Sequence, residues 1–270
     1  MTKAFSVASW NVRHFKGNEA RVERVMRFLK EQNPDIIALY EATGREVFST
    51  IRHHFPGYTF HMTEGQRIQE ILLGIRNSQD AFVSQKLQFD TGLTVLRPGL
   101  LVTVMDRGSV YPMLIYHLNT RQEPQGMGLR DYMLERAFKF RKALEKLAWE
   151  VGDPKANYIF LGNLNIMGMK YPFSKGIEPS MEIQKWDEEA TKNYNMRRLT
   201  KTHNVTFVSP DGSFEGDLDH VYAADHLSFK KFDGAEIDVR GWVAEPKEKQ
   251  KGWRDRFSDH ALLYFEVEKV

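Results

Sequence analysis

The chain has 270 residues, of which 41% are hydrophobic and 27% are charged, and its net charge is +2 with a pI near 8.6. This composition is typical of a globular protein with a large core, and the weak basic bias is compatible with a polyanionic substrate without arguing for one. The absence of cysteine excludes disulfides, thiolate zinc sites and cysteine nucleophiles. The sequence has neither a signal-peptide-like apolar run nor the ~20 apolar residues of a membrane span, so we expect a cytoplasmic protein outside the membrane.

The first elements along the chain predict a layered α/β architecture. Residues 4–12 are rich in Val, Phe and Trp and predict a strand. Residues 19–32 have apolar side chains at helical spacing, and Pro34 ends that helix. Residues 35–42 form a continuous apolar run, which is typical of a strand covered on both faces. This strand–helix–strand opening favours stacked sheets and helices.

The rest of the chain continues with strands and helices. Further strands are predicted at 70–77, 81–89, 100–106, 111–120 and 157–163, with a last one at the end of 247–267. A hairpin turn is expected at 106–109 and a long helix at 129–152, where Gly152 suits a C-terminal stop. Residues 168–217 are irregular around a short helical stretch near 180–198. Because no linker or repeat interrupts the pattern, we expect a single domain over residues 1–270.

Several polar residues lie at or just past the ends of apolar strands. They are Asn11, Glu41, His117, Asn163, Asn165, Asp219, Asp259 and His260. Each alone has an ordinary explanation, as a turn-capping Asn or Asp or as a structural histidine. In α/β proteins, however, sites gather where strands end, so we expect the set to converge.

The chemistry of the converged set would be specific. Carboxylate and amide oxygens suit Mg²⁺ or Mn²⁺, and such an ion polarises a phosphoryl oxygen. A His–Asp pair fixes the histidine tautomer and lets the ring hold or move protons near neutral pH. Phosphodiester hydrolysis needs these parts together.

Six short motifs carry a resemblance to a known family. In chain order they are "WNVRHF", "IIALYEA", "YHLNT", "LGNLN", "LDHVY" and "SDHALLYFEV". Their order over nearly the whole chain resembles the endonuclease/exonuclease/phosphatase superfamily, and most closely the deoxyribonuclease I-like enzymes. The resemblance implies an α/β fold, a four-layered α/β sandwich in which two central mixed β-sheets are flanked by helices.

The resemblance also implies roles for individual residues. The implied metal ligands are Asn11, Glu41 and Asp259, and the implied catalytic residues are His117, His260, Asp219, Glu70, Asn163 and Asn165. Glu70 would pair with His117, with Gln69 as a rival for that position, and Asp219 would orient His260. Arg13 and Arg121 would contact phosphate, for which a guanidinium fork is well shaped, although a surface ion pair explains either equally well.

One residue departs from the family pattern. After the strand at 157–163 the family has Gly-Asp-x-Asn, whereas this chain has Gly162-Asn163-Leu164-Asn165. An amide cannot act as an anionic ligand or take the proton of a nucleophilic water. We therefore predict strongly impaired catalysis. Asn163 is either an engineered knock-out or a natural feature, with the other ligands sufficing or the protein only binding its ligand.

The substrate remains open between several classes. Two histidines and Arg13 resemble the deoxyribonuclease branch, so we expect a nuclease that binds nucleic acid, DNA above all, with no obligate protein partner evident. The alternatives are a phosphomonoesterase, a lipid or inositol-phosphate hydrolase, and a non-catalytic nucleic-acid-binding module. Basic residues at 136–146 suit a solvated helix face, and those at 197–203 are candidates for a substrate-facing loop. Residues 168–176 either line the site or form a loop without function.

Overall fold

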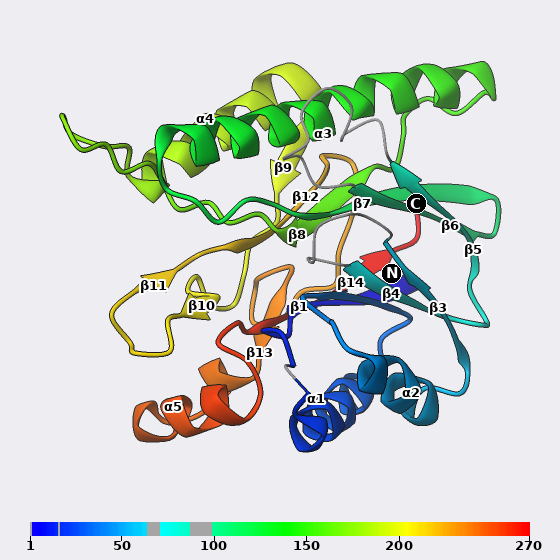
Figure 1. Cartoon of the computed structure of the whole chain (residues 1–270). Coiled ribbons are helices and arrows are strands. Elements are labelled where there is room, and N and C mark those ends of the chain that lie inside the picture. The colour runs from blue at the N-terminus through cyan, green and yellow to red at the C-terminus, as the bar shows by residue number, and fades with distance from the viewer. Residues whose placement is uncertain (1, 16, 64–70, 87–98) are drawn as a thin grey trace. The chain divides into compact units, whose positions relative to one another are not determined.

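The computed structural model describes residues 2–15, 17–63, 71–86 and 99–270 (Figure 1). They divide into two compact units that interleave along the chain. Unit 1 comprises Met1–Ala81, Thr200–Gly216 and Ser228–Val270, and unit 2 comprises Phe82–Leu199 and Asp217–Leu227. The predicted single domain over 1–270 stays a prediction, and the units are described one at a time.

Unit 1 is built on a mixed sheet with six strands in the described part of the chain. In spatial order these are β13 (Asp238–Arg240), β14 (Leu262–Glu268), β1 (Lys3–Asn11), β2 (Ile36–Tyr40), β4 (Ile71–Arg76) and β3 (Tyr58–Met62). The central strands β1 and β2 are parallel, and β1 pairs antiparallel with β14. Parallel pairing brings the C-terminal ends of β1 and β2 to the same edge of the sheet.

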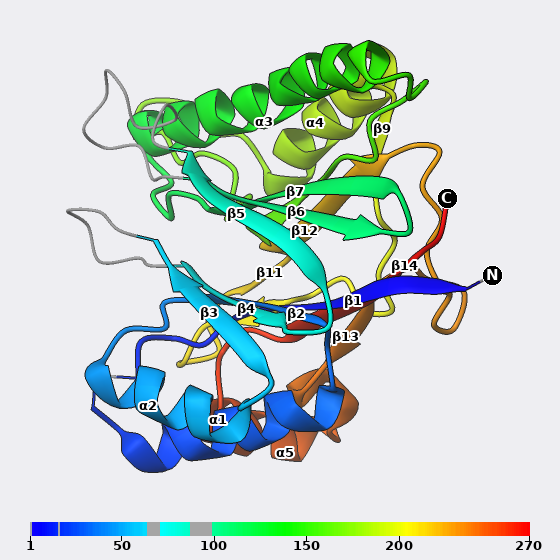
Figure 2. The same cartoon turned by 90° about the vertical axis from the view of Figure 1, so that its right-hand side faces the viewer.

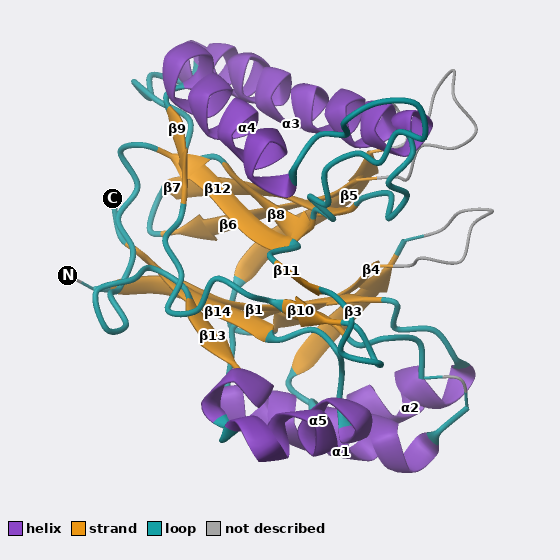
Figure 3. Ribbon diagram, turned by 90° about the vertical axis from the view of Figure 1, so that its left-hand side faces the viewer, coloured by secondary structure: helices purple, strands orange, loops and turns teal. Residues whose placement is uncertain are grey.

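Three helices of unit 1 lie against one face of its sheet (Figure 3). They are α1 (Glu19–Gln32), α2 (Arg45–His54) and α5 (Lys247–Arg256). α1 begins where the Asn18 side chain accepts a hydrogen bond from the Arg21 N–H, and it ends at Asn33 in the left-handed conformation. Its bounds are those predicted. α2 and α5 are elements that the sequence analysis did not predict.

Unit 2 has a second mixed sheet. Its described strands, in spatial order, are β5 (Asp80–Lys86), β6 (Gly99–Asp106), β7 (Ser109–His117), β8 (Ile159–Asn163), β12 (Asp219–Ala224) and β9 (Met196–Arg198). β7 and β8 are parallel, and β12 pairs antiparallel with β8. The predicted turn at 106–109 joins β6 to β7, with Arg107 and Gly108 both at positive φ.

Helices α3 (Pro124–Glu150) and α4 (Pro179–Tyr194) run side by side over one face of the unit 2 sheet (Figure 2). Each has a proline in its first turn, where the missing N–H has no helical partner to lose. α3 begins before the predicted 129–152, because Pro124 starts the helix ahead of the apolar pattern. Aromatic rings of α3, β8 and β12 form the core between helices and sheet, with Phe138 against Phe160 and Tyr222.

The predicted α/β class, with mixed sheets flanked by helices, is confirmed. The stretch 168–217, expected to be irregular, contains α4, β9 and the short pair β10 (Phe207–Val208) and β11 (Glu215–Gly216). In the described residues, no helix combines the length and apolarity needed to cross a membrane.

Candidate active site

The predicted site residues are divided between the two units. The unit 1 set is Asn11, Arg13, Glu41, Asp259 and His260, and the unit 2 set is His117, Arg121, Asn163, Asn165 and Asp219. Glu70 and its rival Gln69 lie outside the described residues. Both sets are built at strand ends, as expected.

The unit 1 set begins with a contact between Asn11 and Glu41. Asn11 is the last residue of β1 and lies in register with Tyr40, the last residue of β2, so Glu41 follows directly at the same edge. Asn11 Nδ2 donates to Glu41 Oε1 at 3.0 Å. Asn11 Oδ1 accepts the backbone N–H of Arg13 at 2.9 Å, which fixes the orientation of the amide.

Arg13 connects this pair to Asp259. Its Nε lies 3.3 Å from Asp259 Oδ2. Ser258 Oγ donates to the Asn11 carbonyl at 2.6 Å, and the His260 N–H donates to the same hydroxyl at 3.2 Å. A continuous line of contacts therefore runs from Glu41 through Asn11 and Arg13 to Asp259, and His260 is attached to it through Ser258.

The backbone of the unit 1 set adopts unusual conformations. Arg13, His14 and Glu41 all have positive φ, at 50°, 27° and 60°. Such conformations cost a non-glycine residue on the order of 1 kcal/mol each and persist where surrounding contacts hold them. The strand predicted over 35–42 ends at Tyr40 for this reason, because Glu41 leaves the extended conformation.

A buried arginine holds these conformations in place. Arg21 of α1 donates to the carbonyls of Val12 (2.9 Å), Arg13 (2.6 Å), His14 (2.6 Å) and Phe257 (2.8 Å). The loop after β1 and the loop before β14 are thereby tied to one side chain. Burial, with Arg13 adding, lowers the pKa of the Arg21 guanidinium from its ordinary value.

A polar hollow of about 340 Å³ lies beside the unit 1 set. Its lining residues are Arg13, His14, Phe15, Asn18, Arg21 and Asp255. His14 Nε2 lies 3.0 Å from Glu41 Oε2, so the hollow shares a wall with the predicted metal ligands. Three of its lining side chains are basic, which suits an anion.

The unit 1 set has the donor chemistry of a hard-cation site. Asn11, Glu41 and Asp259 offer amide and carboxylate oxygens, the ligands that Mg²⁺ and Mn²⁺ prefer. Glu41 Oε1 accepts a hydrogen bond from Asn11, and Glu41 Oε2 lies 3.0 Å from His14 Nε2. A carboxylate oxygen can accept more than one partner, which is compatible with a metal ligand. The described His, Asp and Glu side chains form no group of three suited to a metal, and the predicted set contains only two carboxylates.

In unit 2 the strand register brings three predicted residues together. Asn163, the last residue of β8, is paired with His117 on the parallel strand β7 and with Asp219 on the antiparallel strand β12. Registered neighbours project to the same face of a sheet. All three residues are almost fully buried. His117, Asn163 and Asp219 therefore form a row across the sheet.

Asn165 extends this row. Its Nδ2 donates to the Leu118 carbonyl at 2.8 Å and to Asn163 Oδ1 at 3.2 Å, and its φ is 52°. Gly162 has a φ of 156°, and a Cβ there would lie 1.9 Å from the Tyr116 carbonyl oxygen. The close approach of β7 and β8 before the row therefore requires glycine.

Arg121 does not join the row. Its side chain is exposed, and NH1 lies 3.7 Å from Glu123 Oε1. Its backbone has a clearer role, because the Arg121 carbonyl accepts a hydrogen bond from Arg130 of α3 at 2.5 Å. Arg130 also donates to the Gly168 carbonyl and forms a buried ion pair with Glu182 of α4 at 2.9 Å. The loops that follow β7 and β8 are thus fixed by one buried pair.

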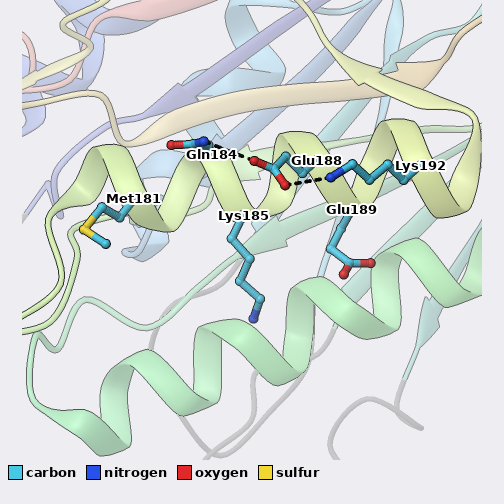
Figure 4. Close-up of a pocket in the computed structure, with 6 residues that line it drawn as sticks. All are labelled: Met181, Gln184, Lys185, Glu188, Glu189 and Lys192. Carbon is cyan, nitrogen blue, oxygen red and sulfur yellow. Dashed lines mark hydrogen bonds and ion pairs between the residues drawn. The ribbon is translucent and has the colours of Figure 1, made fainter.

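Two other charged surfaces have ordinary explanations. The described residues that line the hollow on α4 all belong to that helix, and among them Glu188 accepts hydrogen bonds from Gln184 and Lys192 (Figure 4). Lys185 also forms an ion pair with Asp131 of α3. In the basic stretch 197–203, Arg198 forms a bidentate pair with Asp187, with Nε donating to Oδ1 and Nη2 to Oδ2. We assign neither surface a part in the site.

Comparison with known proteins decides the family. The profile of the Endonuclease/Exonuclease/phosphatase family matches residues 8–260. The chain belongs to this family. The superfamily and fold implied by the six motifs are confirmed, and the fold is one used by hydrolases of phosphate esters. A search of curated protein sequences finds no match.

Solved structures of low sequence identity share the fold. A Bacteroides vulgatus endonuclease/exonuclease/phosphatase is 13% identical with a TM-score of 0.69, covering 100% of both chains. Danio rerio TDP2, solved with a single-strand DNA product, is 14% identical with a TM-score of 0.60, covering 98% of this chain and 99% of that one. A Bacteroides thetaiotaomicron mannosyl-6-phosphatase is 13% identical with a TM-score of 0.61, covering 98% and 100%.

Sequence reasoning missed the residues that hold the two sets. Arg21 and Arg130 were not singled out, and neither was the contact of His14 with Glu41. A signal exists for Arg130, since it shares a helical stripe with the buried residues Leu134 and Phe138. An arginine in an apolar stripe needs a buried partner. Arg21 gives a weaker signal of the same kind, because it is a charged residue directly before the buried residue Val22 in α1.

Proposed function

We propose that this chain is a divalent-metal-dependent phosphodiesterase of the deoxyribonuclease I-like kind, that its substrate is DNA, and that Asn163 lowers its turnover. Family membership supports the general reaction, hydrolysis of a phosphate ester. The observation that carries the finer proposal is the buried row in which Asn163 lies in register between His117 and Asp219. A single amide stands where the family motif has a carboxylate, among neighbours that match.

The unit 1 set binds the metal and the phosphate in this proposal. Asn11, Glu41 and Asp259 hold Mg²⁺ or Mn²⁺, which when bound polarises a phosphoryl oxygen and offsets the charge that grows in the transition state. The planar guanidinium of Arg13, next to Asp259 and lining the polar hollow, binds a phosphate oxygen. Arg21 holds the loop after β1 and the loop before β14 in the required conformation through its four carbonyl contacts.

The unit 2 set supplies the proton chemistry and orients the water. His117 holds or moves protons at the attacking or leaving oxygen or clamps the phosphate, and Asp219 fixes a histidine tautomer. His260 of the unit 1 set is proposed for the same kind of role. Asn165 and Asn163 orient the water and the phosphate. The Asn163 amide can accept a hydrogen bond through Oδ1, as it does from Asn165, but it cannot take a proton from the nucleophile.

Two other functions have specific support. The mannosyl-6-phosphatase of the same fold favours a phosphomonoesterase, because it removes a phosphate rather than cleaving a diester. The amide at 163 favours a binding module that keeps its ligand without turnover. The single-strand DNA product bound to Danio rerio TDP2 favours the nuclease, which we prefer.

The test restores the carboxylate. The variant Asn163→Asp is incubated with plasmid DNA, single-stranded DNA, RNA, a phosphorylated inositol and a sugar phosphate, each with Mg²⁺, Mn²⁺ or EDTA. We expect metal-dependent DNA cleavage to rise about 100- to 1,000-fold, the range that one preorganised transition-state contact contributes. Asn204→Asp makes the same charge change at an exposed residue of unit 1 and should give no increase.

Each outcome of this assay decides between the functions. Release of inorganic phosphate without DNA nicking supports the phosphomonoesterase, and retention of DNA without cleavage supports the binding module. No gain with any substrate contradicts the role given to Asn163. Adding Glu41→Gln or His117→Ala to Asn163→Asp tests whether both sets serve one reaction, since residues that act together lose activity non-additively.

A further inference from the structure

An exposed aromatic loop follows β8, a few residues after Asn163 and Asn165. We define the aromatic loop as residues 170–175, with the sequence Lys-Tyr-Pro-Phe-Ser-Lys. Tyr171 is 43% exposed and Phe173 is 86% exposed. The two rings contact each other edge to face, with centroids 5.8 Å apart. A single exposed ring is ordinary, but two exposed rings in contact form a small apolar patch, and such patches are more often binding surfaces.

The base of this loop is fixed. Met169 and Ile177 exchange two backbone hydrogen bonds of 2.8 Å, and the Lys170 N–H donates to the Gln122 carbonyl at 2.8 Å. The Gly168 N–H donates to Glu182 Oε2 at 2.7 Å, which connects the loop to the buried Arg130 pair. The aromatic tip therefore stands on a base that is tied to the loop after β7.

Two glycines make this base possible. A Cβ at Gly168 would lie 2.1 Å from the Ile177 carbonyl oxygen, and a Cβ at Gly176 would lie 2.0 Å from that of Met169. Both approaches are too close for any other residue. The chain thus closes tightly beneath the loop and turns the side chains of 171–175 outward, where all are exposed.

The charge of the loop selects among possible ligands. Lys170 and Lys175 flank the two rings, and no acidic residue occurs from 169 to 177. Rings that offer flat faces, next to cations, are the combination by which proteins bind single-stranded nucleic acid: bases stack on the rings and phosphates meet the lysines. Pro172 between the rings restricts the backbone, which lowers the entropy lost on binding.

We propose that the aromatic loop binds unpaired bases of a single-stranded nucleic-acid segment adjoining the phosphodiester to be cleaved. Tyr171 and Phe173 stack on bases, and Lys170 and Lys175 pair with the backbone. This inference rests on the proposed function and deepens it, because it names single-stranded or frayed DNA rather than intact duplex as the preferred substrate.

Binding measured in EDTA tests the loop without turnover. A fluorescein-labelled oligo-dT 12-mer and a blunt duplex of the same length are titrated with the parent chain and with the double variant Tyr171→Ala/Phe173→Ala. We expect the single-strand Kd to rise about 5- to 50-fold and the duplex Kd to change less than about twofold. Trp149→Ala removes another strongly exposed ring (77%), near the end of α3, and should leave both Kd values unchanged.

A second variant separates stacking from insertion into a lipid surface. Phe173→Leu keeps an exposed apolar side chain but removes the flat ring, so it should weaken oligo-dT binding while leaving any binding to phosphatidylcholine/phosphatidylserine vesicles intact. If the alanine variants lose vesicle binding and keep oligo-dT binding, the loop is a membrane contact and the proposal is overturned. Equal loss for single strand and duplex also overturns it, because the rings would then contact a feature that both forms of DNA share and not unpaired bases.

A spectroscopic readout and a turnover readout complete the test. Phe173→Trp should show fluorescence quenching by oligo-dT beyond that of the parent chain, since quenching reports direct stacking; no added quenching contradicts the proposal.

In the Asn163→Asp background, the loop variants should raise KM for single-stranded DNA and leave kcat within about twofold. If Asn163→Asp cleaves DNA and adding the loop substitutions leaves its KM unchanged, the loop inference fails and the proposed function stands. If Asn163→Asp cleaves nothing, the proposed function fails regardless of the binding result.

Discussion

Each unit holds its predicted residues with a buried arginine, but the two arginines are used differently. Arg21 in unit 1 donates to four loop carbonyls and lines the polar hollow. Arg130 in unit 2 donates to two loop carbonyls and pairs with Glu182, where both side chains are buried to 1% exposure or less. Both arginines come from the helix that follows a site-bearing strand.

The difference distinguishes a charge that is neutralised and only stabilises the fold from a charge that can still attract a ligand. Carbonyl dipoles hold Arg21 without cancelling its unit charge, so a positive field remains at a hollow suited to an anion. The Glu182 carboxylate neutralises Arg130, so that pair orders loops and contributes little field. Unit 2 can rely on strand register for its row, whereas unit 1 relies on loops in strained conformations and needs an added constraint.

The largest effect is expected on breaking the unit 2 pair. Arg130→Met leaves Glu182 charged and buried and should lower the free energy of unfolding by about 3–5 kcal/mol in urea denaturation. Glu182→Leu added to Arg130→Met should cost less than the sum of the single changes. Lys185→Met removes an exposed ion pair with Asp131 and should cost less than about 1 kcal/mol. A cost for Arg130→Met as small as that of Lys185→Met would contradict the structural role.

A middle-sized effect is expected in unit 1. Arg21→Lys keeps the charge but cannot reach four carbonyls, and we expect a loss of about 2 kcal/mol in unfolding free energy. Arg21→Met should in addition weaken oligonucleotide binding and reduce its salt dependence, because one positive charge is gone. If Arg130→Met, measured where it is folded, reduces the salt dependence equally, the proposed contrast between the arginines is wrong.

The smallest effect concerns the end of the unit 1 sheet away from the predicted set. Burial raises the pKa of Asp35, but hydrogen bonds from Lys3 and Ser6 outweigh it and hold the pKa below the ordinary 3.8. A depressed folded-state pKa contributes stability above pH 3.8, and this stability is lost as the pH falls through the folded-state value. Asp35→Asn should therefore cost about 1 kcal/mol at pH 7 and flatten the acid limb of the stability curve.

Activity distinguishes this last variant from the others. Asp35 directly precedes β2 and connects it to β1: its carboxylate accepts the Ser6 N–H, and its own N–H donates to the Ser6 hydroxyl. Asn11 and Glu41 lie at the opposite ends of these strands. In the Asn163→Asp background, Asp35→Asn should leave kcat/KM unchanged below the melting temperature. A parallel fall in activity would mean that the sheet transmits the change along its strands.

The sequence predicts what local patterns determine. The helix over 19–32 is predicted to the residue, because its apolar spacing and Pro34 just beyond its end are local signals. α5 was missed because its sequence, "KEKQKGWRDR", is almost entirely polar, and α2 lacks a side-chain cap at Gly44. The proximity of Asn11 to Glu41 follows from parallel strands.

Other features of the site depend on contacts remote in sequence. Arg21 reaches Phe257 and Arg130 reaches Glu182 across long separations that no periodicity encodes. The row of His117, Asn163 and Asp219 required the register of three strands, one of them antiparallel. Sequence motifs identified these residues through resemblance to a family, and the register gives a physical reason why His117, Asn163 and Asp219 are neighbours.

Gly162 has a practical consequence for anyone who redesigns this enzyme class. Any side chain there would meet the Tyr116 carbonyl and push apart the two strands whose next residues are His117 and Asn163. Libraries that randomise the "LGNLN" stretch will therefore lose most members to misfolding before chemistry is sampled. Diversity is better introduced in residues 171–175, which project into solvent and can vary while the strands beneath them keep their spacing.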